Sequence, residues 1–268
     1  MDDAAEGTPY TGGRVFVSER TFIIAEAGSC HDGEFTRAVE LILAAKRAGA
    51  DACKFQFWSS PERLAARRNA ADYLDVYRKY ALPTEWLPML KAQCDHVGIE
   101  FMCTVYLRED IPVIAPFVKR FKVASFEAGD IDFVMAHPLG KLIASTGMMG
   151  WVPIWLRGRA ELLHCVSAYP CPEEQASLGA IAGCAGYSDH TRNILTGAFA
   201  VCVGARILEV HFRLDATDPR NPDYGTALAP YELREYVNYV RMAERMLGDG
   251  IKRPQPAEAP MEKYRVKP

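Results

Sequence analysis

The chain has 268 residues, a formal net charge of −3 and 49% hydrophobic residues, so it is long enough for one large domain with a substantial core. Its nearly balanced charge and the lack of a long apolar run argue against nucleic acid, anionic membrane surfaces and a membrane span. The acidic start is no secretory signal, and eight scattered cysteines without a Cys-x-x-Cys pair favour a reduced, cytoplasmic setting.

Short apolar strands alternate with helical segments from residue 21 onward. The predicted strands are 21–26, 52–57, 99–104, 120–125, 142–146 and 160–166, with a seventh ending at 188–190 and an eighth at 209–211. The predicted helices are 36–48, 84–96, 191–203 and 230–247, and a long polar stretch fills 59–79. Eight continuous apolar strands in this rhythm indicate a parallel (β/α)8 TIM barrel of the α/β class.

The outer layer of this barrel is expected to be irregular in one place. Residues 149–159, after the fifth strand, are too few and too broken by proline for a full barrel helix. One outer helix is therefore expected to be shortened or lost, which would expose apolar surface that a partner subunit could cover. The predicted domains are an N-terminal extension or hairpin at 1–20, the barrel at 21–252 and a linker-like tail at 253–268.

Polar side chains gather at the predicted carboxyl ends of the strands, where barrel enzymes carry their chemistry. Lys54 and Lys122 lie late in otherwise apolar strands, and a buried lysine is costly unless it meets an anion. Each lysine alone could instead snorkel to the barrel rim. The two together predict a phosphate or carboxylate cradle completed by the strand-end hydroxyls of Thr104, Ser125, Ser145 and Ser188.

Two histidines close the last two predicted strands. His190 and His211 each follow a short apolar run, so parallel strands would point both imidazoles into one cleft. Two histidines with carboxylates nearby are the minimum for a divalent metal site with open positions. The alternative for each histidine is a single imidazole satisfied by a backbone partner.

The motifs along almost the whole chain resemble the catalytic barrel of the N-acetylneuraminate (sialic acid) synthase family, which also makes pseudaminic and legionaminic acids. The motifs are Ile23–Ser29, His31, Gly33, Ala50–Gln56, Phe121–Ser125, Glu127, Ser145–Met148, Leu163–Pro170, Gly186–Thr191, Glu209–Phe212 and Gly248–Lys252. Their order and spacing make the resemblance specific. It implies a transferase that condenses phosphoenolpyruvate with the aldehyde form of a sugar and releases phosphate.

The resemblance also implies a role for each strand-end residue. His190 and His211 would hold a divalent metal, manganese or magnesium, that polarises the aldehyde oxygen. Glu127 would lie beside C2 of the enolpyruvyl group, and Glu209 and Asp189 would shuttle protons or orient the metal ligands. The implied substrate-binding residues are Lys54, Thr104, Lys122, Ser125, Ser145, Ser167 and Ser188 around phosphoenolpyruvate, and Glu26, Gln56, Tyr169 and Asp223 facing the sugar.

Besides the short segment 149–159, where the family normally has a full helix, the sequence departs from the family pattern in two further places. Cys30 stands where the family usually has asparagine before the histidine, and we interpret it as a small packed residue rather than a ligand or nucleophile. The sequence stops at Pro268, where the family usually continues into an antifreeze-like domain that caps a neighbour's site and contacts the N-acetyl group through an arginine. We therefore expect a homodimer and an acceptor that need not carry an N-acetyl group. We also expect another segment over the site, from this subunit or its partner: the loop 58–79, the segment 149–155 or the tail after residue 251. The candidates to replace the arginine are Arg192, Arg213 and Arg220.

Three functions are compatible with the sequence. The first is a phosphoenolpyruvate-dependent synthase of a 3-deoxy-2-keto sugar acid. The second is a related metal-dependent aldolase that uses pyruvate or another acceptor, and the third is a non-catalytic barrel that acts as a binding subunit. The retained charges at Lys54, Lys122 and Glu127 argue against the third, because a chain without catalytic function would lose costly buried charges first.

Overall fold

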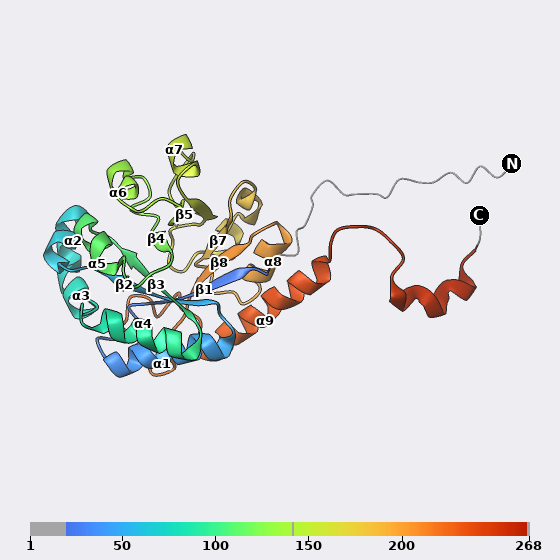
Figure 1. Ribbon diagram of the computed structural model, residues 1–268, viewed down its shortest axis with the longest axis horizontal. Helices are drawn as coiled ribbons and strands as arrows, with labels where there is room; N and C mark the ends of the chain where they lie inside the picture. Colours follow the sequence, from blue (N-terminus) through green and yellow to red (C-terminus); the bar gives the residue numbers. More distant parts are fainter. Residues whose placement is uncertain (1–19, 141, 267–268) are drawn as a thin grey trace.

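The computed structural model describes residues 20–140 and 142–266, so almost all of the predicted N-terminal extension lies outside the described residues. Eight parallel strands close into a barrel in chain order (Figure 1). The strands are β1 Phe22–Gly28, β2 Ala52–Phe57, β3 Glu100–Val105, β4 Phe121–Val123, β5 Leu142–Ser145, β6 Glu161–His164, β7 Gly186–Asp189 and β8 Ile207–His211. The predicted TIM barrel is confirmed.

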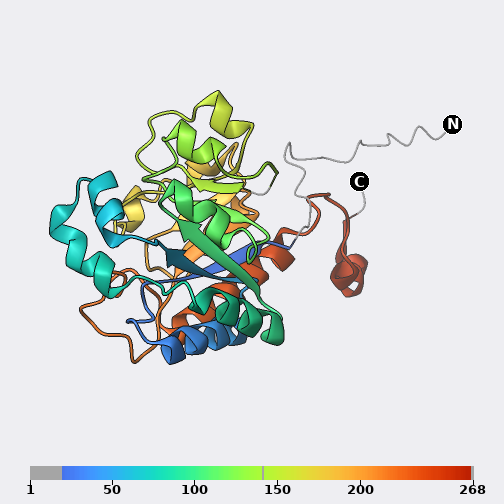
Figure 2. The ribbon, with the colours of Figure 1, turned by 60° about the vertical axis from the view of Figure 1, so that its left-hand side comes forward.

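The helices of the outer layer differ greatly in length. They are α1 Phe35–Ala48, α2 Pro61–Arg67, α3 Leu74–Lys79, α4 Trp86–Val97, α5 Ile111–Ile114, α6 Ile131–Met135, α7 Ile154–Arg157, α8 Thr196–Cys202 and α9 Pro230–Leu247. The long helices α1, α4 and α9 lie together on one side of the barrel in both ribbon views (Figures 1 and 2). The opposite side carries the short helices α6 and α7.

The shortened helix after β5 is confirmed, because α7 has only four residues. The reduction extends further than predicted: α5 has four residues and α6 has five, and only 3-10 turns, η3 Glu173–Gln175 and η4 Leu178–Ile181, link β6 to β7. Pro116 and Pro138 lie two and three residues after α5 and α6 and disfavour their extension, whereas α7 begins after Pro153 and ends before Gly158.

Two predicted segments differ from the structure. The helix predicted at 191–203 begins only at Thr196, because Thr191 and Asn193 form local turns in which their side chains accept backbone N–H groups at 3.2 and 2.8 Å. The polar stretch 59–79 contains two helices, α2 and α3, that were not predicted. Ser60 caps α2 by accepting the N–H of Arg63 at 3.2 Å, and Pro61 sets its first turn.

The barrel interior is built in layers because inward-facing side chains alternate along each strand. An apolar layer lies at the bottom and consists of Ile24, Ala52, Met102, Ile143, Leu163 and Ile207. Two residues further along β1 and β2, Glu26 and Lys54 face inward and are paired in register. The same register places Thr104 beside Lys122 and Ser188 beside Glu209. Polar groups from distant parts of the chain thus form the next layer.

The tail after α9 contributes no side chain to the barrel core. Its described part is exposed throughout and contains one 3-10 helix, η5 Pro256–Tyr264; Figure 1 shows it leading away from the barrel. In the part of the chain that the structure describes, no helix has the length and apolar character needed to cross a bilayer.

Candidate active site

A cavity of about 770 Å³ opens at the carboxyl ends of the strands. Apart from Ser167 and Asp189, every predicted site residue lines it. The strand ends, which lie far apart in the sequence, therefore meet in one pocket, as expected for a barrel of this class.

The cavity floor is a chain of alternating buried charges. The ammonium of Lys54 lies 2.5 Å from Glu26 Oε2 and 3.5 Å from Glu209 Oε2, and the ammonium of Lys122 lies 3.5 Å from Glu209 Oε1. All four side chains are at most 5% exposed. Glu209 thus lies between two lysines that would otherwise repel each other.

The two lysines differ in how strongly the folded protein holds their protons. Burial lowers the pKa of Lys54, but the carboxylates of Glu209 and Glu26 outweigh this effect and raise it overall. Burial dominates at Lys122, where attraction to Glu209 does not compensate and Lys54 adds repulsion, so its pKa is lowered. The nearby carboxylates therefore stabilise the charge of Lys122 by less than its burial destabilises it.

Hydroxyl groups surround the two lysines. Lys54 donates to Thr104 Oγ1 and Lys122 to Ser145 Oγ, each at 2.8 Å. Ser188 donates to Glu209 at 2.9 Å. The two ammonium groups and the hydroxyls of Thr104, Ser145 and Ser188 thus line the same cavity.

Ser167 is half-buried, does not line the cavity, and donates a hydrogen bond of 2.8 Å to Ser125, which does. Gly147 makes this arrangement possible, because a Cβ on Gly147 would lie 2.1 Å from Ser167 Oγ and 3.1 Å from Ser125 Cβ. Ser167 is thus linked to the cavity lining through Ser125.

The two predicted metal-binding histidines lie side by side, with ring centroids 5.5 Å apart. His190 Nδ1 is 2.7 Å from the carbonyl of Val166, which directs its Nε2 toward Ser188, and burial with the nearby His211 lowers the pKa of His190 to about 4. A neutral imidazole with one nitrogen fixed by a carbonyl is the usual state of a metal ligand. His211 Nδ1 is buried without a hydrogen bond among the described residues and lies 3.7 Å from Asp223 Oδ1.

These donors suit a divalent ion with open coordination positions. Within residues 20–140 and 142–266, no group of three His, Cys, Asp or Glu side chains forms a ready metal cluster. Two imidazoles, one with an unpartnered buried nitrogen, could still hold an ion whose remaining ligands come from water and substrate.

Asp189 points away from the cavity. Its Oδ1 accepts the N–H and the hydroxyl of Thr191, both at 2.8 Å, and Thr191 in turn contacts Thr196 at the start of α8. Strand alternation explains this, because neighbouring Ser188 and His190 face inward. This position is compatible with orientation of the His190 strand end and not with proton transfer to a substrate.

The opposite wall of the cavity is formed by Glu26, Gln56 and Asp223. Gln56 donates to Glu26 Oε1 at 2.8 Å, and Asp223 Oδ2 accepts the N–H and the hydroxyl of Ser29 at 2.9 and 2.7 Å. Gly28 lies directly beneath with a φ of +50°, and a Cβ there would lie 2.4 Å from Asp223 Oδ2. A glycine is needed here because of both its backbone conformation and this close approach.

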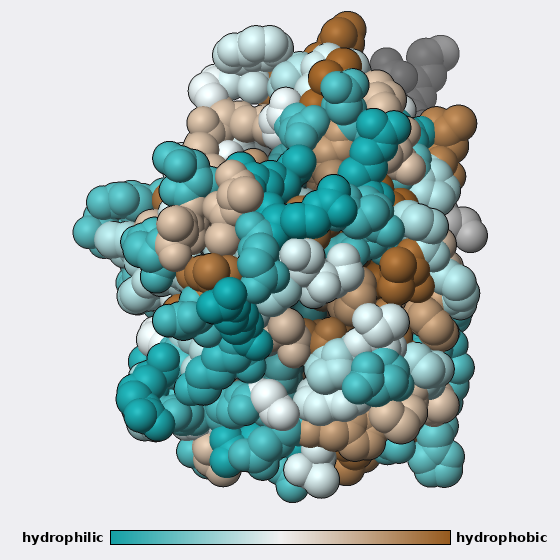
Figure 3. Space-filling view, turned by 90° about the vertical axis from the view of Figure 1, so that its left-hand side faces the viewer, coloured by the Kyte–Doolittle hydropathy of each residue, from teal (hydrophilic) through white to brown (hydrophobic). Residues whose placement is uncertain are grey.

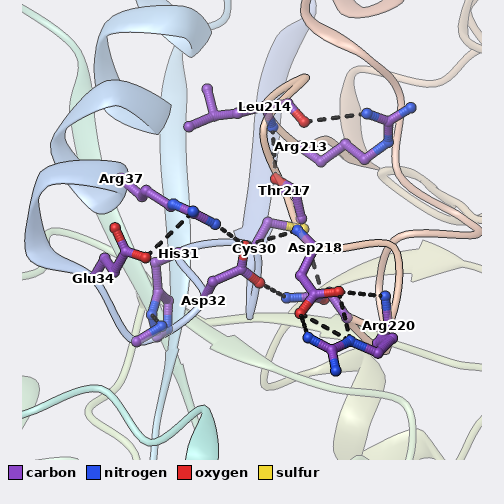
Figure 4. Close-up of polar contacts among 12 residues, drawn as sticks. Cys30, His31, Asp32, Glu34, Arg37, Arg213, Leu214, Thr217, Asp218 and Arg220 are labelled. Carbon is purple, nitrogen blue, oxygen red and sulfur yellow. Dashed lines mark hydrogen bonds and ion pairs between the residues drawn. The ribbon is translucent and has the colours of Figure 1, made fainter.

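A polar network fixes the loop that carries Asp223. Asn221 donates to the Ser29 carbonyl at 2.9 Å and to Asp32 at 2.8 Å, and Arg37 of α1 forms an ion pair with Asp32. Figure 4 shows the pair of Arg37 and Asp32 after β1 beside Asp218 of the loop after β8. Asp223 is thus held by two segments almost 200 positions apart in the sequence.

Cys30 and the three candidate arginines lie outside the cavity lining. Cys30 is fully buried and burial raises the pKa of its thiol well above the ordinary value, which agrees with a packed residue. Arg213 stacks on Tyr224 at 4.2 Å and donates to the Leu214 carbonyl, whereas Arg220 pairs with Asp218 (Figure 4). None of Arg192, Arg213 and Arg220 lines the cavity.

One of the three segments expected to cover the site, residues 58–79, lines a wall of the cavity together with side chains that follow β3 and β4. Aromatic and basic side chains form it: Trp58, Arg67, Arg68, Tyr73, Tyr77, Tyr80, Tyr106 and Phe126. Several belong to a separate apolar cluster around Leu64, and hydrophilic residues cover most of the outer face on this side (Figure 3). The signal in the sequence was the spacing of Tyr73, Tyr77 and Tyr80 by four and three residues, which is typical of one helix face. Charged residues between them obscured it.

Residues 41–252 match the model of the NeuB family. The chain belongs to the NeuB family. A relative from Legionella pneumophila, N,N'-diacetyllegionaminic acid synthase, is 34% identical over 90% of this chain and 77% of its own length. Mouse N-acetylneuraminate-9-phosphate synthase is 30% identical over 88% of this chain and 74% of its own length.

Solved structures agree with this membership. The N-acetylneuraminic acid synthetase of Leptospira borgpetersenii superposes with a TM-score of 0.81 at 28% identity and covers 96% of each chain. The predicted family is confirmed, and the chain is similar along nearly its whole length to enzymes that synthesise sugar acids.

Proposed function

We propose that this NeuB-family enzyme condenses phosphoenolpyruvate with the aldehyde form of a sugar, giving a 3-deoxy-2-keto sugar acid and phosphate. The observation that carries the proposal is the joint placement of two buried lysines, their hydroxyl partners and two imidazoles around one cavity. Relatives named as sugar-acid synthases support the same reaction class.

The reaction makes and breaks three bonds of interest. C3 of the enolpyruvyl group forms a bond to the aldehyde carbon, whose oxygen takes up a proton. Water then forms a bond to C2, and the bond between C2 and the phosphate oxygen breaks, so phosphate leaves with the bridging oxygen and C2 becomes a ketone.

Lys54 and Lys122 bind the phosphate and carboxylate of phosphoenolpyruvate in this proposal. Both ammonium groups lie in the polar layer of the barrel, and charge-assisted hydrogen bonds to anions are stronger than neutral ones. The under-compensated charge of Lys122 would gain most from an anion. Thr104, Ser145 and Ser188 add hydroxyl donors around the same anion.

His190 and His211 would hold manganese or magnesium. When bound, such an ion supplies Lewis acidity for the oxygen of the acceptor aldehyde. The chain's own contribution is to keep His190 neutral through burial and to fix its ring through the Val166 carbonyl. Asp223 lies close enough to His211 to orient its ring.

Two further groups act on the substrates. Glu127 is the base for the water that adds to C2, because it lines the cavity and its Oε2 is buried without a hydrogen bond among the described residues. Glu26, Gln56, Tyr169 and Asp223 form the wall that would contact the sugar. Their polar atoms suit hydroxyl groups, and the Tyr169 ring lies 4.3 Å from that of His190.

Phosphate release tests the proposal. The purified protein is incubated with phosphoenolpyruvate, manganese and each of a panel of aldoses, and free phosphate is measured. Release that depends on one aldose supports a synthase. Condensation from pyruvate with no phosphate release would instead establish the aldolase alternative, and no reaction with any aldose would contradict catalysis of this class.

A further inference from the structure

Arg68 contacts Glu127 from across the cavity. It is the first residue after α2, and both its Nε and one terminal nitrogen donate to the same oxygen, Glu127 Oε1, at 3.0 and 2.7 Å. The Glu127 side chain is only 2% exposed. The carboxylate is thus held through one oxygen, and Oε2 is left free of hydrogen bonds in the described part of the chain.

We propose that Arg68 is a positioning residue that orients Glu127 and keeps it ionised, so that Oε2 can accept a proton from the attacking water. The inference rests on the proposed function for the chemistry at C2. It adds the residue that follows the unpredicted helix α2 to the machinery of the reaction.

The position of Arg68 is fixed by several independent contacts. Its guanidinium lies over the ring of Tyr106 at 4.6 Å and that of Phe126 at 5.3 Å. Its backbone N–H donates to the carbonyl of Leu64 in α2 at 3.0 Å. Asn69, the next residue, lies in the left-handed region with a φ of +49°. The backbone of Arg68 and its guanidinium are thus both held in place. Such a guanidinium can set the direction of a carboxylate, because its donors lie in one rigid plane.

The charges around Glu127 leave Arg68 as its direct cationic partner. Arg67 lies close but pairs with Asp130 at 2.7 Å, and Lys122 of β4 donates to Ser145. Burial raises the pKa of Glu127, whereas Arg68, Arg67 and Lys122 act in the opposite direction, and burial wins. Removal of Arg68 would therefore raise this pKa further.

The kinetic consequence follows from the role of the base. A carboxylate base loses activity as the pH falls through its pKa, so a higher pKa moves the acid limb of the kcat profile to higher pH. We expect Arg68→Gln to shift this limb upward by about one unit or more and to lower kcat about 10- to 100-fold. The KM for phosphoenolpyruvate should change little.

Arg68→Lys separates charge from orientation. Lysine keeps the positive charge but not the two hydrogen bonds that converge on Glu127 Oε1, so this variant should lose kcat while its acid limb moves less than that of Arg68→Gln. Arg63→Gln is the matched control: it removes an arginine from the same helix whose partner is Glu109, on the exposed side. It should leave kcat and the pH profile unchanged.

Titration of the Glu127 carboxyl by ¹³C NMR tests the inference without any substrate. Glu127→Gln identifies its signal in protein labelled at glutamate, and Arg68→Gln should raise its pKa by about one unit or more. An unchanged Glu127 pKa in Arg68→Gln would overturn the inference, as would unchanged kcat in both Arg68 variants. If the wild-type protein released no phosphate, the proposed function would fail, while this titration would still decide whether Arg68 controls Glu127. If Arg68→Gln did not fold, the smaller rise expected in Arg68→Lys would decide in the same way.

Discussion

Lys122→Met should weaken phosphoenolpyruvate binding without weakening the fold. The folded protein holds the Lys122 proton less tightly than the unfolded chain does, so the charged lysine costs stability at neutral pH, below its unfolded pKa of about 10.4. Methionine has a similar length, needs no anion and removes this cost, but it also removes the cation that most lowers the pKa of buried Glu209. The two effects oppose each other, so the melting temperature should change little.

The loss in binding follows from one charge-assisted bond. Such a bond contributes about 1.5–3 kcal/mol, which corresponds to a rise in Kd of roughly 10- to 150-fold. Calorimetric titration with phosphoenolpyruvate measures this rise, and Lys119→Met, at an exposed residue shortly before β4, is the control.

Lys54→Met offers a contrast. The raised pKa of Lys54 contributes stability at neutral pH that is lost only as the pH rises through the folded pKa, so this variant should melt at a lower temperature. Unchanged affinity in Lys122→Met, or a clear loss of its stability, would refute the reasoning.

Three further predictions follow from the site and its surroundings. Replacement of both His190 and His211 by alanine should abolish turnover and manganese binding with the circular dichroism spectrum retained; turnover by this variant in excess chelator would disprove the metal role. Gly28→Ala should raise the KM for the sugar and cost about 1 kcal/mol or more of stability, measured by kinetics and urea unfolding, because the new Cβ would meet Asp223; an unaffected sugar KM would argue against Asp223 as a sugar contact. The protein should be a homodimer in light scattering, since Trp151 and Ile154 beside the short helix α7 are 75% and 87% exposed; a monomer at micromolar concentration would contradict this.

The barrel and most of the cavity lining could be predicted because strands impose simple rules. A polar residue late in an apolar strand must face the cavity or lose hydration, and parallel strands bring such residues to one end. Lys54 and Lys122 illustrate this, since each is an isolated charge in a β-strand of buried residues. The prediction for Asp189 was less exact, because side chains alternate along a strand and a position one residue away faces the opposite side.

The segment 58–79 could be predicted only as one of three candidate covers, and its helices and cavity-facing side chains could not be predicted. The segment 59–79 is rich in charge, so its apolar side chains, such as Leu64 and Tyr77, did not stand out as a face that packs on the barrel. Arg68 is surrounded by other arginines in the sequence, and only the folded position of Glu127 distinguishes it. The contact joins residues 59 positions apart, which local spacing cannot reveal.

The most direct test of the central claim follows an oxygen atom. Phosphoenolpyruvate labelled with ¹⁸O at the bridging oxygen is converted with the preferred aldose, and both products are analysed by mass spectrometry. Cleavage between C2 and the bridging oxygen predicts that the label appears in phosphate and that the keto acid gains the three carbons of the enolpyruvyl group. Label retained in the keto acid would show cleavage at phosphorus and would contradict the proposed condensation.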